Sequence, residues 1–179
     1  MVQSRDITIT TITENSTAAP EILAEWGLSV FIETGKNTFL LDTGTTDMIT
    51  YNADKLKVDL RKVETVVLSH GHYDHTGGLL TLADTARSFE LILKECIFLK
   101  KYAYKNGKYE FKGNAFNEED LQNLNVSYRF VEDECSQLLP GVWLLTDFPR
   151  VHADEAANPR FVVEKDGEYR RDDFDDEVV

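Results

Sequence analysis

Ser-His-Gly-His-Tyr-Asp-His-Thr-Gly-Gly-Leu, at residues 69–79, is the stretch that decides how this chain folds. It holds three of the chain's four histidines, and an aspartate lies among them. Imidazole nitrogens and carboxylate oxygens both bind zinc and similar divalent ions. By alternation His70 and His72 can point the same way, while Asp74 and His75 can serve a neighbouring position. The pattern predicts a metal site with two ions side by side.

The residues before this stretch indicate how it is held in place. Val66-Val67-Leu68 is a wholly apolar run, which is typical of a strand buried on both faces. A loop that directly follows such a strand is held rigidly enough to aim its side chains. Gly71, Gly77 and Gly78 allow the tight backbone that the loop needs. The alternative is an incidental polar loop with scattered histidines, and the H-x-H-x-D-H spacing after a buried strand favours the metal site.

Hydrophobic periodicity and turn residues predict the other elements. Strands are predicted at 6–13, 28–33, 38–41, 66–68, 90–93, 126–131 and 142–146, helices after Asp47, at 79–86 and after Asn117, and hairpins around Asn106-Gly107 and Asp166-Gly167. Residues 14–25 are predicted to form a loop. Because strands and helices intermix along the chain, the predicted fold class is α/β (α+β) with mixed sheets.

The composition limits the classes of partner. The formal net charge is −13, and so acidic a surface repels phosphate backbones and anionic lipids. We therefore expect a small-molecule substrate, with neither nucleic acid nor membrane as a partner. The dense charges at residues 170–177 are interpreted as a solvated turn. The chain has two cysteines that form no C-x-x-C pattern, and its sequence shows neither a signal peptide nor an apolar run long enough to span a membrane. These features predict a cytoplasmic protein.

The sequence at 69–79, together with Leu-Leu-Asp-Thr-Gly at 40–44, resembles two motifs of the metallo-β-lactamase superfamily. Further stretches narrow the resemblance to one branch: Gly27-Leu28-Ser29, Asn52-Ala53-Asp54-Lys55-Leu56 and Val58-Asp59-Leu60. That branch is similar to the dihydropterin-linked ribofuranosylaminobenzene-phosphate synthase of methanopterin biosynthesis and its bacterial relatives. The resemblance covers nearly all of the chain, but it is strong only over residues 27–79.

The resemblance implies a site and a reaction. His70 and His72 would bind a first divalent metal ion, and Asp74 and His75 a second, with zinc expected and iron or manganese as alternatives. Asp74 would also be the catalytic residue that orients the nucleophile. Asp42 would lie beside the metal-binding loop and support it. Hydroxide shared by the two ions would attack an ester, phosphoester or similar bond of a small molecule, phosphorylated or pterin-like. The chain would thus be a metal-dependent hydrolase.

One departure from the family pattern leaves alternatives open. The family fold is a four-layer αββα sandwich, and residues 1–179 are expected to be a single domain made of its N-terminal half plus an insertion, incomplete at the C-terminus. The expected Gly-Cys-Ser-His-like motif is absent, and His152 is interpreted as a surface histidine rather than a ligand. The chain would be a fragment, a short form completed by a second chain or a homo-oligomer, or a form that has lost its second half. The alternative function is therefore a non-catalytic metal-binding half-domain that needs a partner chain.

Overall fold

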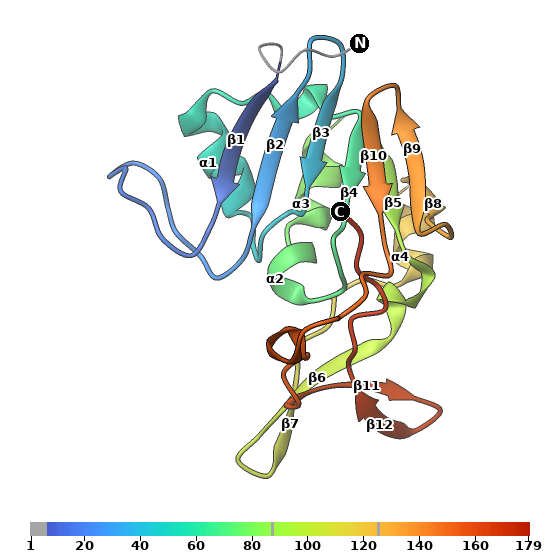
Figure 1. Ribbon diagram of the computed structural model, residues 1–179. Helices are drawn as coiled ribbons and strands as arrows, with labels where there is room; N and C mark the ends of the chain where they lie inside the picture. Colours follow the sequence, from blue (N-terminus) through green and yellow to red (C-terminus); the bar gives the residue numbers. More distant parts are fainter. Residues whose placement is uncertain (1–6, 87, 125) are drawn as a thin grey trace.

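A six-stranded mixed sheet forms the centre of the computed structural model, which describes residues 7–86, 88–124 and 126–179 (Figure 1). In sheet order its strands are β1 (Thr8–Thr13), β2 (Ser29–Glu33), β3 (Thr38–Leu41), β4 (Thr65–Val67), β5 (Glu90–Leu93) and β8 (Ser127–Phe130). The β1–β2 and β2–β3 pairs are antiparallel, and the β3–β4, β4–β5 and β5–β8 pairs are parallel. Strand β4 therefore lies between parallel neighbours, and its residues are all buried, as its apolar sequence predicts.

Helices cover one face of this sheet. They are α1 (Met48–Leu56), α3 (Leu79–Thr85) and α4 (Glu118–Asn123), and α1 and α3 lie behind the sheet in Figure 1. Their apolar side chains, such as Ile49 and Leu79, form the main core with Leu40, Val66 and Leu91 of the sheet. Helix α4 begins with a capping box, in which Asn117 and Asp120 bond to each other's backbone N–H groups.

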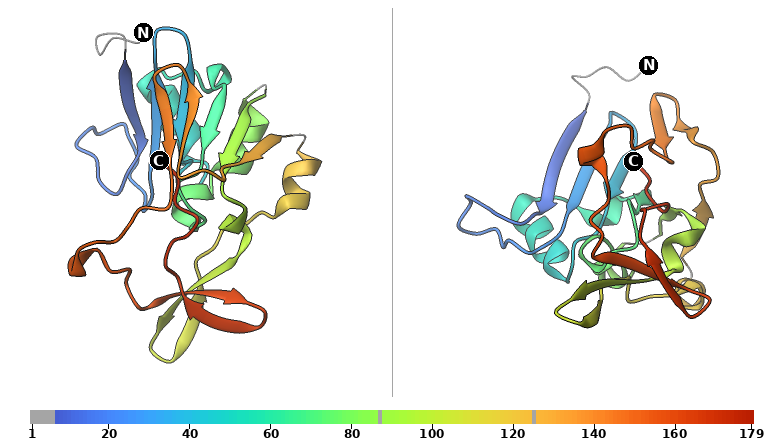
Figure 2. Two further views of the ribbon diagram at one scale, coloured as in Figure 1. Left: turned by 45° about the vertical axis from the view of Figure 1, so that its right-hand side comes forward. Right: turned by 60° about the horizontal axis from the view of Figure 1, so that its bottom comes forward.

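A two-stranded sheet packs on the opposite face. It consists of β9 (Cys135–Leu139) and β10 (Val142–Leu145), drawn in orange in Figures 1 and 2. A second, smaller apolar cluster joins it to the main sheet: Val67, Ile92, Val131, Leu144 and Val178. The molecule thus has a layer of helices, a large sheet and a small second sheet. Strand β9 was not predicted, because its sequence lacks the alternation of apolar and polar residues that indicates a strand.

A separate four-stranded sheet lies below the main sheet in Figure 1. Its order is β12 (Glu168–Arg171), β11 (Phe161–Lys165), β6 (Lys100–Lys105) and β7 (Lys108–Phe111). Both predicted hairpins are present in it, with positive φ angles at Asn106, Gly107, Asp166 and Gly167. Those angles are the ones that a tight two-residue hairpin turn requires.

The predicted fold class, α/β with mixed sheets, is confirmed, and local details differ. Asp47 precedes α1 but its side chain makes no capping bond; the hydroxyl of Thr46 accepts from the Met48 N–H instead. The structure has a helical turn, α2 (Tyr73–Thr76), where a loop was predicted. This turn lies within residues 69–79, hereafter the histidine segment. In the described part of the chain, no helix has the length and apolar character needed to cross a membrane.

Asn52 ties the loop after β1 to the helical layer. Its side chain is fully buried on α1, donates to the carbonyl oxygens of Ile12 (2.9 Å) and Leu23 (2.8 Å), and accepts from the Leu23 N–H (2.9 Å). Every polar atom of the amide is satisfied, so the loop that follows β1 has one position relative to α1.

Asn52→Asp should destabilise the fold. The substitution replaces a donor with a carboxylate oxygen that faces two buried carbonyl oxygens, and we expect a loss of roughly 2–4 kcal/mol in the free energy of unfolding. Urea titration followed by circular dichroism measures it. The control is the same change at the exposed hairpin residue Asn106, where the unfolding free energy should be unchanged. Equal effects at the two positions would contradict this account of the loop.

Candidate metal centre

The histidine segment begins where β4 ends, at the carboxyl edge of the parallel strands. Several backbone bonds hold it there: the Tyr73 N–H donates to the Lys112 carbonyl (2.9 Å) and the Thr43 N–H to the His75 carbonyl (2.7 Å). Gly77 and Gly78 allow close packing, because an added Cβ would lie 2.1 Å and 2.2 Å from carbonyl oxygens of neighbouring backbone. The side chains of the segment are therefore presented by a fixed backbone.

Asp42 lies behind this segment. It follows β3, has a φ of 58°, and is fully buried. Its carboxylate accepts three hydrogen bonds of 2.7 Å each, from the Ser69 N–H, the Ser69 hydroxyl and Nδ1 of His75. Three donors compensate the cost of burying the charge. Asp42 thus joins the end of β3 to both ends of the histidine segment.

The hydrogen bonds around Ser69 show which ring nitrogen of His70 carries the proton. The Ser69 hydroxyl has one proton, and its shortest contact is the charged acceptor Asp42, so its Oγ remains free only to accept. Nδ1 of His70 lies 3.0 Å from that Oγ and therefore donates to it. The other ring nitrogen of His70, Nε2, is left with a lone pair.

That lone pair faces His72. Nε2 of His70 lies 3.0 Å from Nδ1 of His72, while Nε2 of His72 is buried without a hydrogen-bond partner. The nearest acidic atom to it is Oδ2 of Asp172, at 3.7 Å. Burial, followed by nearby positive groups, holds the pKa of His70 well below its usual range and lowers the pKa of His72 to about 4. Both rings are therefore neutral near pH 7, which is the form in which imidazole binds metals.

Asp74 and His75 form a second pair. Nε2 of His75 lies 3.8 Å from Oδ2 of Asp74, and Nδ1 of the same ring is held by Asp42. Burial lowers the pKa of His75, but the hydrogen bond and charge of Asp42 outweigh it, so the pKa is raised. The four residues that the sequence pattern picked out lie together as two pairs. Among the described residues, no group of three or more His, Cys, Asp or Glu side chains is arranged to hold one ion.

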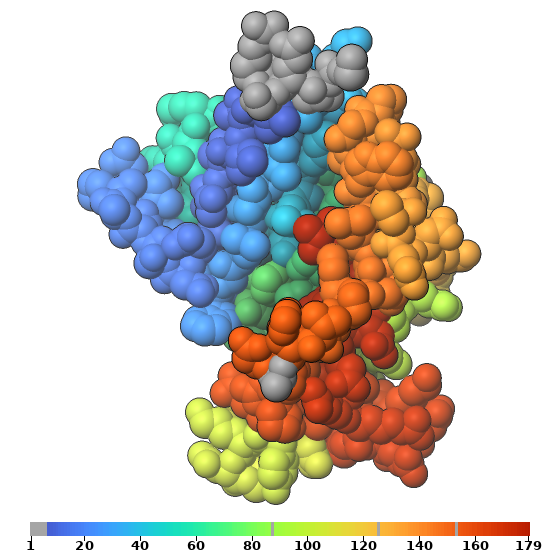
Figure 3. Space-filling view, in the orientation of Figure 1, coloured from blue at the N-terminus to red at the C-terminus, as the bar shows by residue number. Residues whose placement is uncertain are grey.

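A pocket of about 320 Å³ opens beside the second pair. Its lining includes Asp74 and His75, together with Glu14, Asn15 and Trp26 from the loop between β1 and β2. The Trp26 side chain is 65% exposed. Figure 3 shows the region around α2, in green, reaching the surface between the blue strands and the orange and red segments. A small molecule in this pocket would touch both the ligand pair and an aromatic face.

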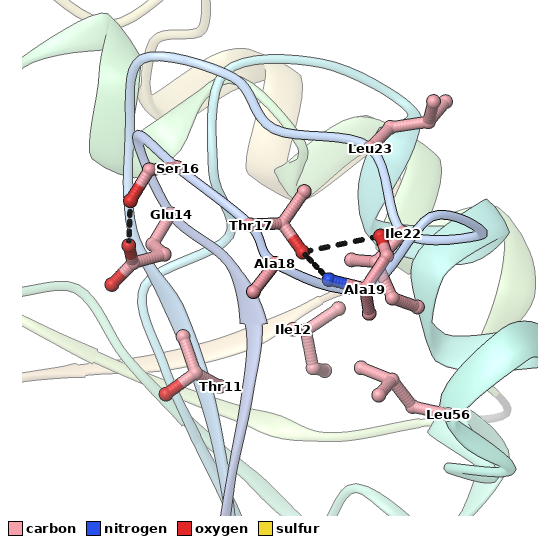
Figure 4. Close-up of a pocket in the computed structure, with 10 residues that line it drawn as sticks. All are labelled: Thr11, Ile12, Glu14, Ser16, Thr17, Ala18, Ala19, Ile22, Leu23 and Leu56. Atoms are coloured by element: carbon pink, nitrogen blue, oxygen red, sulfur yellow. Dashed lines mark hydrogen bonds between the residues drawn. The ribbon is translucent and has the colours of Figure 1, made fainter.

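A second pocket, of about 310 Å³, contains none of the four residues (Figure 4). It lies under the loop after β1 and is lined mostly by small and apolar side chains, including Ile12, Ile22 and Leu56. Its polar groups bond within the loop: the Ser16 hydroxyl donates to Glu14, and Thr17 bonds the backbone of Ala19. It offers no cluster of reactive groups.

One prediction about the site region is wrong. Residues 170–177 were interpreted as a solvated turn, but Asp172 and Asp176 are 2% and 1% exposed and lie around the buried ammonium of Lys101. Nothing in the local pattern showed this, because Lys101 lies on β6, far away in the sequence. His152 is exposed, and its backbone N–H donates to Glu155 at the start of a 3-10 turn.

Known proteins resemble this chain over most of its length. A profile of the metallo-beta-lactamase superfamily matches residues 27–163. The 7,8-dihydropterin-6-methyl-4-(beta-D-ribofuranosyl)-aminobenzene-5'-phosphate synthase of Methanocaldococcus jannaschii is 28% identical over 130 residues, which is 68% of this chain and 44% of that protein. The uncharacterized protein MJ0448 of the same organism is 28% identical over 123 residues, 66% of this chain and 48% of that protein.

A solved structure extends the comparison. The crystal structure of Tm1679, a metal-dependent hydrolase of the beta-lactamase superfamily, is 28% identical and superposes with a TM-score of 0.76. The match covers 95% of this chain and 59% of that one. The chain spans about half the length of the curated relatives that it matches.

Asp42→Asn should weaken the fold around the histidine segment. The amide keeps the shape of the side chain but turns an NH₂ group towards one of three donors, and we expect a loss of about 2–4 kcal/mol in the free energy of unfolding. Asp47→Asn is the matched control, because the exposed Asp47 side chain makes no capping bond. Chemical denaturation of both variants measures the difference. An Asp42→Asn chain as stable as the control would show that the three bonds do not hold the segment.

Proposed function

Because the chain belongs to the metallo-β-lactamase superfamily, we propose that it is a metal-dependent hydrolase whose divalent ions bind His70, His72, Asp74 and His75. The observation that carries the proposal is the pair of neutral imidazole nitrogens that face each other at 3.0 Å, Nε2 of His70 and Nδ1 of His72. Members of this superfamily typically bind divalent metals, and this pair suits one.

The distance between the two nitrogens fits a cation. In the chain without an ion, Nδ1 of His72 donates its proton to the lone pair on Nε2 of His70, and a bound cation would take the place of that proton. Zinc bound tetrahedrally to nitrogens at about 2.0–2.1 Å separates them by roughly 3.3 Å, close to the 3.0 Å observed between His70 and His72. Nε2 of His75 and the carboxylate of Asp74 offer a second pair of donor atoms, at 3.8 Å. We therefore propose up to two ions, with zinc preferred and iron or manganese as alternatives.

The chain's own side chains have distinct roles in the proposed mechanism. A divalent ion, when bound, supplies Lewis acidity that makes hydroxide available near neutral pH and stabilises negative charge on the substrate. Asp42 keeps the proton of His75 on Nδ1, so that Nε2 is free to bind. Asp74 is placed to bind and to orient the attacking group rather than to act as a free base.

The pocket suggests the size and shape of the substrate. At about 320 Å³ it suits a small molecule, and the exposed face of Trp26 offers a stacking surface for a flat ring. The relative from Methanocaldococcus jannaschii is named for a dihydropterin-linked phosphate compound. We propose an ester, phosphoester or similar bond of a small molecule, phosphorylated or pterin-like, as the bond that is cleaved.

A specific observation also favours a second candidate function. Each pair supplies two donor atoms, whereas catalytic zinc usually has three protein ligands. The chain would then be a non-catalytic metal-binding half-domain, and a second copy or another chain would complete the site.

The zinc content of the purified chain shows whether the chain binds metal. The purified chain should retain one to two equivalents of zinc after dialysis, measured by elemental mass spectrometry. His70→Ala and His72→Ala should each lower the retained zinc at least severalfold, because either change leaves one donor of the pair. His152→Ala, at an exposed histidine, should retain as much as the unaltered chain. Unchanged zinc in the first two variants would sink the proposed site.

Hydrolysis assays separate the two functions. The zinc-loaded chain should hydrolyse a chromogenic phosphodiester or ester, and Asp74→Ala should lower kcat by at least a hundredfold. Trp26→Ala should raise KM and leave kcat closer to its original value, because stacking contributes to binding. Asp84→Ala, at an exposed position on α3, is the control. Zinc binding without turnover of any such substrate would favour the half-domain.

A further inference from the structure

An apolar groove lies on the face of the main sheet that the helices do not cover. The β9–β10 hairpin packs on this face through Val67 of β4 and Ile92 of β5, and β1, β2 and β3 lie beside the hairpin (Figures 1 and 3). The groove between them has a volume of about 410 Å³. Its lining comes from both sheets and includes Ile32, Phe39, Leu41, Leu138, Val142 and Trp143.

Backbone hydrogen bonds fix one end of this groove, which Val179 lines. Val179 and Leu145 of β10 exchange two backbone hydrogen bonds, of 2.7 Å and 2.9 Å. Just before Val179 in the chain, Oδ2 of Asp176 accepts from the Gly71 N–H (2.7 Å), although these two residues are 105 positions apart. The groove is therefore a preformed part of the fold.

The strands that border the groove are almost free of charge. Strands β1, β2, β3, β9 and β10 contain a single charged residue, Glu33, although 28% of the whole chain is charged. Side chains alternate along a strand, so Glu33 points to the helical side with the buried Phe31 and away from the groove. Two chains of net charge −13 repel each other. On an uncharged face, two copies can meet without bringing like charges together.

Large apolar side chains stand exposed around the groove. Ile9, which lies opposite Ile32 in the β1–β2 pair, is 65% exposed, while Trp143 is 54% and Ile7 is 41% exposed. The exposed surface of these three is roughly 300–400 Å² per copy before the groove walls are counted, and a stable interface buries about 800 Å² per partner. Tryptophan is also enriched among the residues that dominate interface energetics.

We propose that two copies of the chain associate face to face through this groove, with Trp143 of each copy seated in the groove of the other. A twofold arrangement presents the same face on both copies, so every apolar contact is made twice. The groove, at about 410 Å³, has room for an indole ring. The histidine pairs lie outside this face, so the inference does not depend on metal binding.

Analytical ultracentrifugation of the purified chain, from about 1 to 100 µM, measures this association. The unaltered chain should dimerise. Trp143→Lys and Ile9→Lys should each weaken the association at least about 30-fold, because the new charge finds no partner in an apolar interface. Tyr51→Lys is the matched control: an aromatic side chain that is 44% exposed on helix α1, where the change should leave the dimer intact.

Salt gives a second readout. Raising the sodium chloride concentration from about 0.1 to 1 M should strengthen the dimer, because salt screens the repulsion between two acidic chains and leaves apolar contacts in place. Association that weakens with salt would mean that charged groups hold the copies together, and it would overturn the proposal.

The remaining outcomes are equally distinct. An unaltered chain that stays monomeric at every concentration overturns the proposal, and binding of an apolar fluorescent dye that Trp143→Lys abolishes would then give the groove to a small apolar molecule. A dimer that persists in both lysine variants also overturns it. Circular dichroism shows which variants are folded. Because Ile9 and Trp143 lie on different strands, Ile9→Lys decides the matter if Trp143→Lys does not fold.

Discussion

The carboxylate of Asp42 is the interaction on which the site depends. It is fully buried at the end of β3, and its three bonds reach the first residue of the histidine segment and the helical turn that carries His75. A buried carboxylate without donors would be costly, so the segment and the strand hold each other in one arrangement. This contact fixes the backbone at Ser69, next to His70, and the ring of His75.

In each of the three imidazole rings, one nitrogen is directed at a supporting residue, and that residue differs from ring to ring. His70 donates to Ser69, His75 donates to Asp42, and Nε2 of His72 faces Asp172. The remaining nitrogens are the ones that face one another or Asp74. This division of roles orients the ring nitrogens before any ion arrives, which lowers the cost of assembling a metal site.

The local parts of the fold could be predicted from the sequence, and the distant contacts could not. Strand β4 and the hairpins were predicted because an apolar run or an Asn-Gly pair requires nothing from elsewhere in the chain. Strand β9 and helix α2 were missed, since tertiary contacts rather than periodicity define them. The four clustered ligand candidates were visible as a motif, whereas the burial of Asp172 and Asp176 depends on Lys101, more than seventy positions earlier.

The bond from Gly71 to Asp176 also has a consequence for folding kinetics. Closing a loop of 105 residues is slow and loses much chain entropy, so such contacts form late. The β2–β3 hairpin and the neighbouring helices can assemble first from nearby residues. In a partly folded chain the histidine segment then lacks this one contact, and an ion captured early would meet a looser set of donors than in the folded chain.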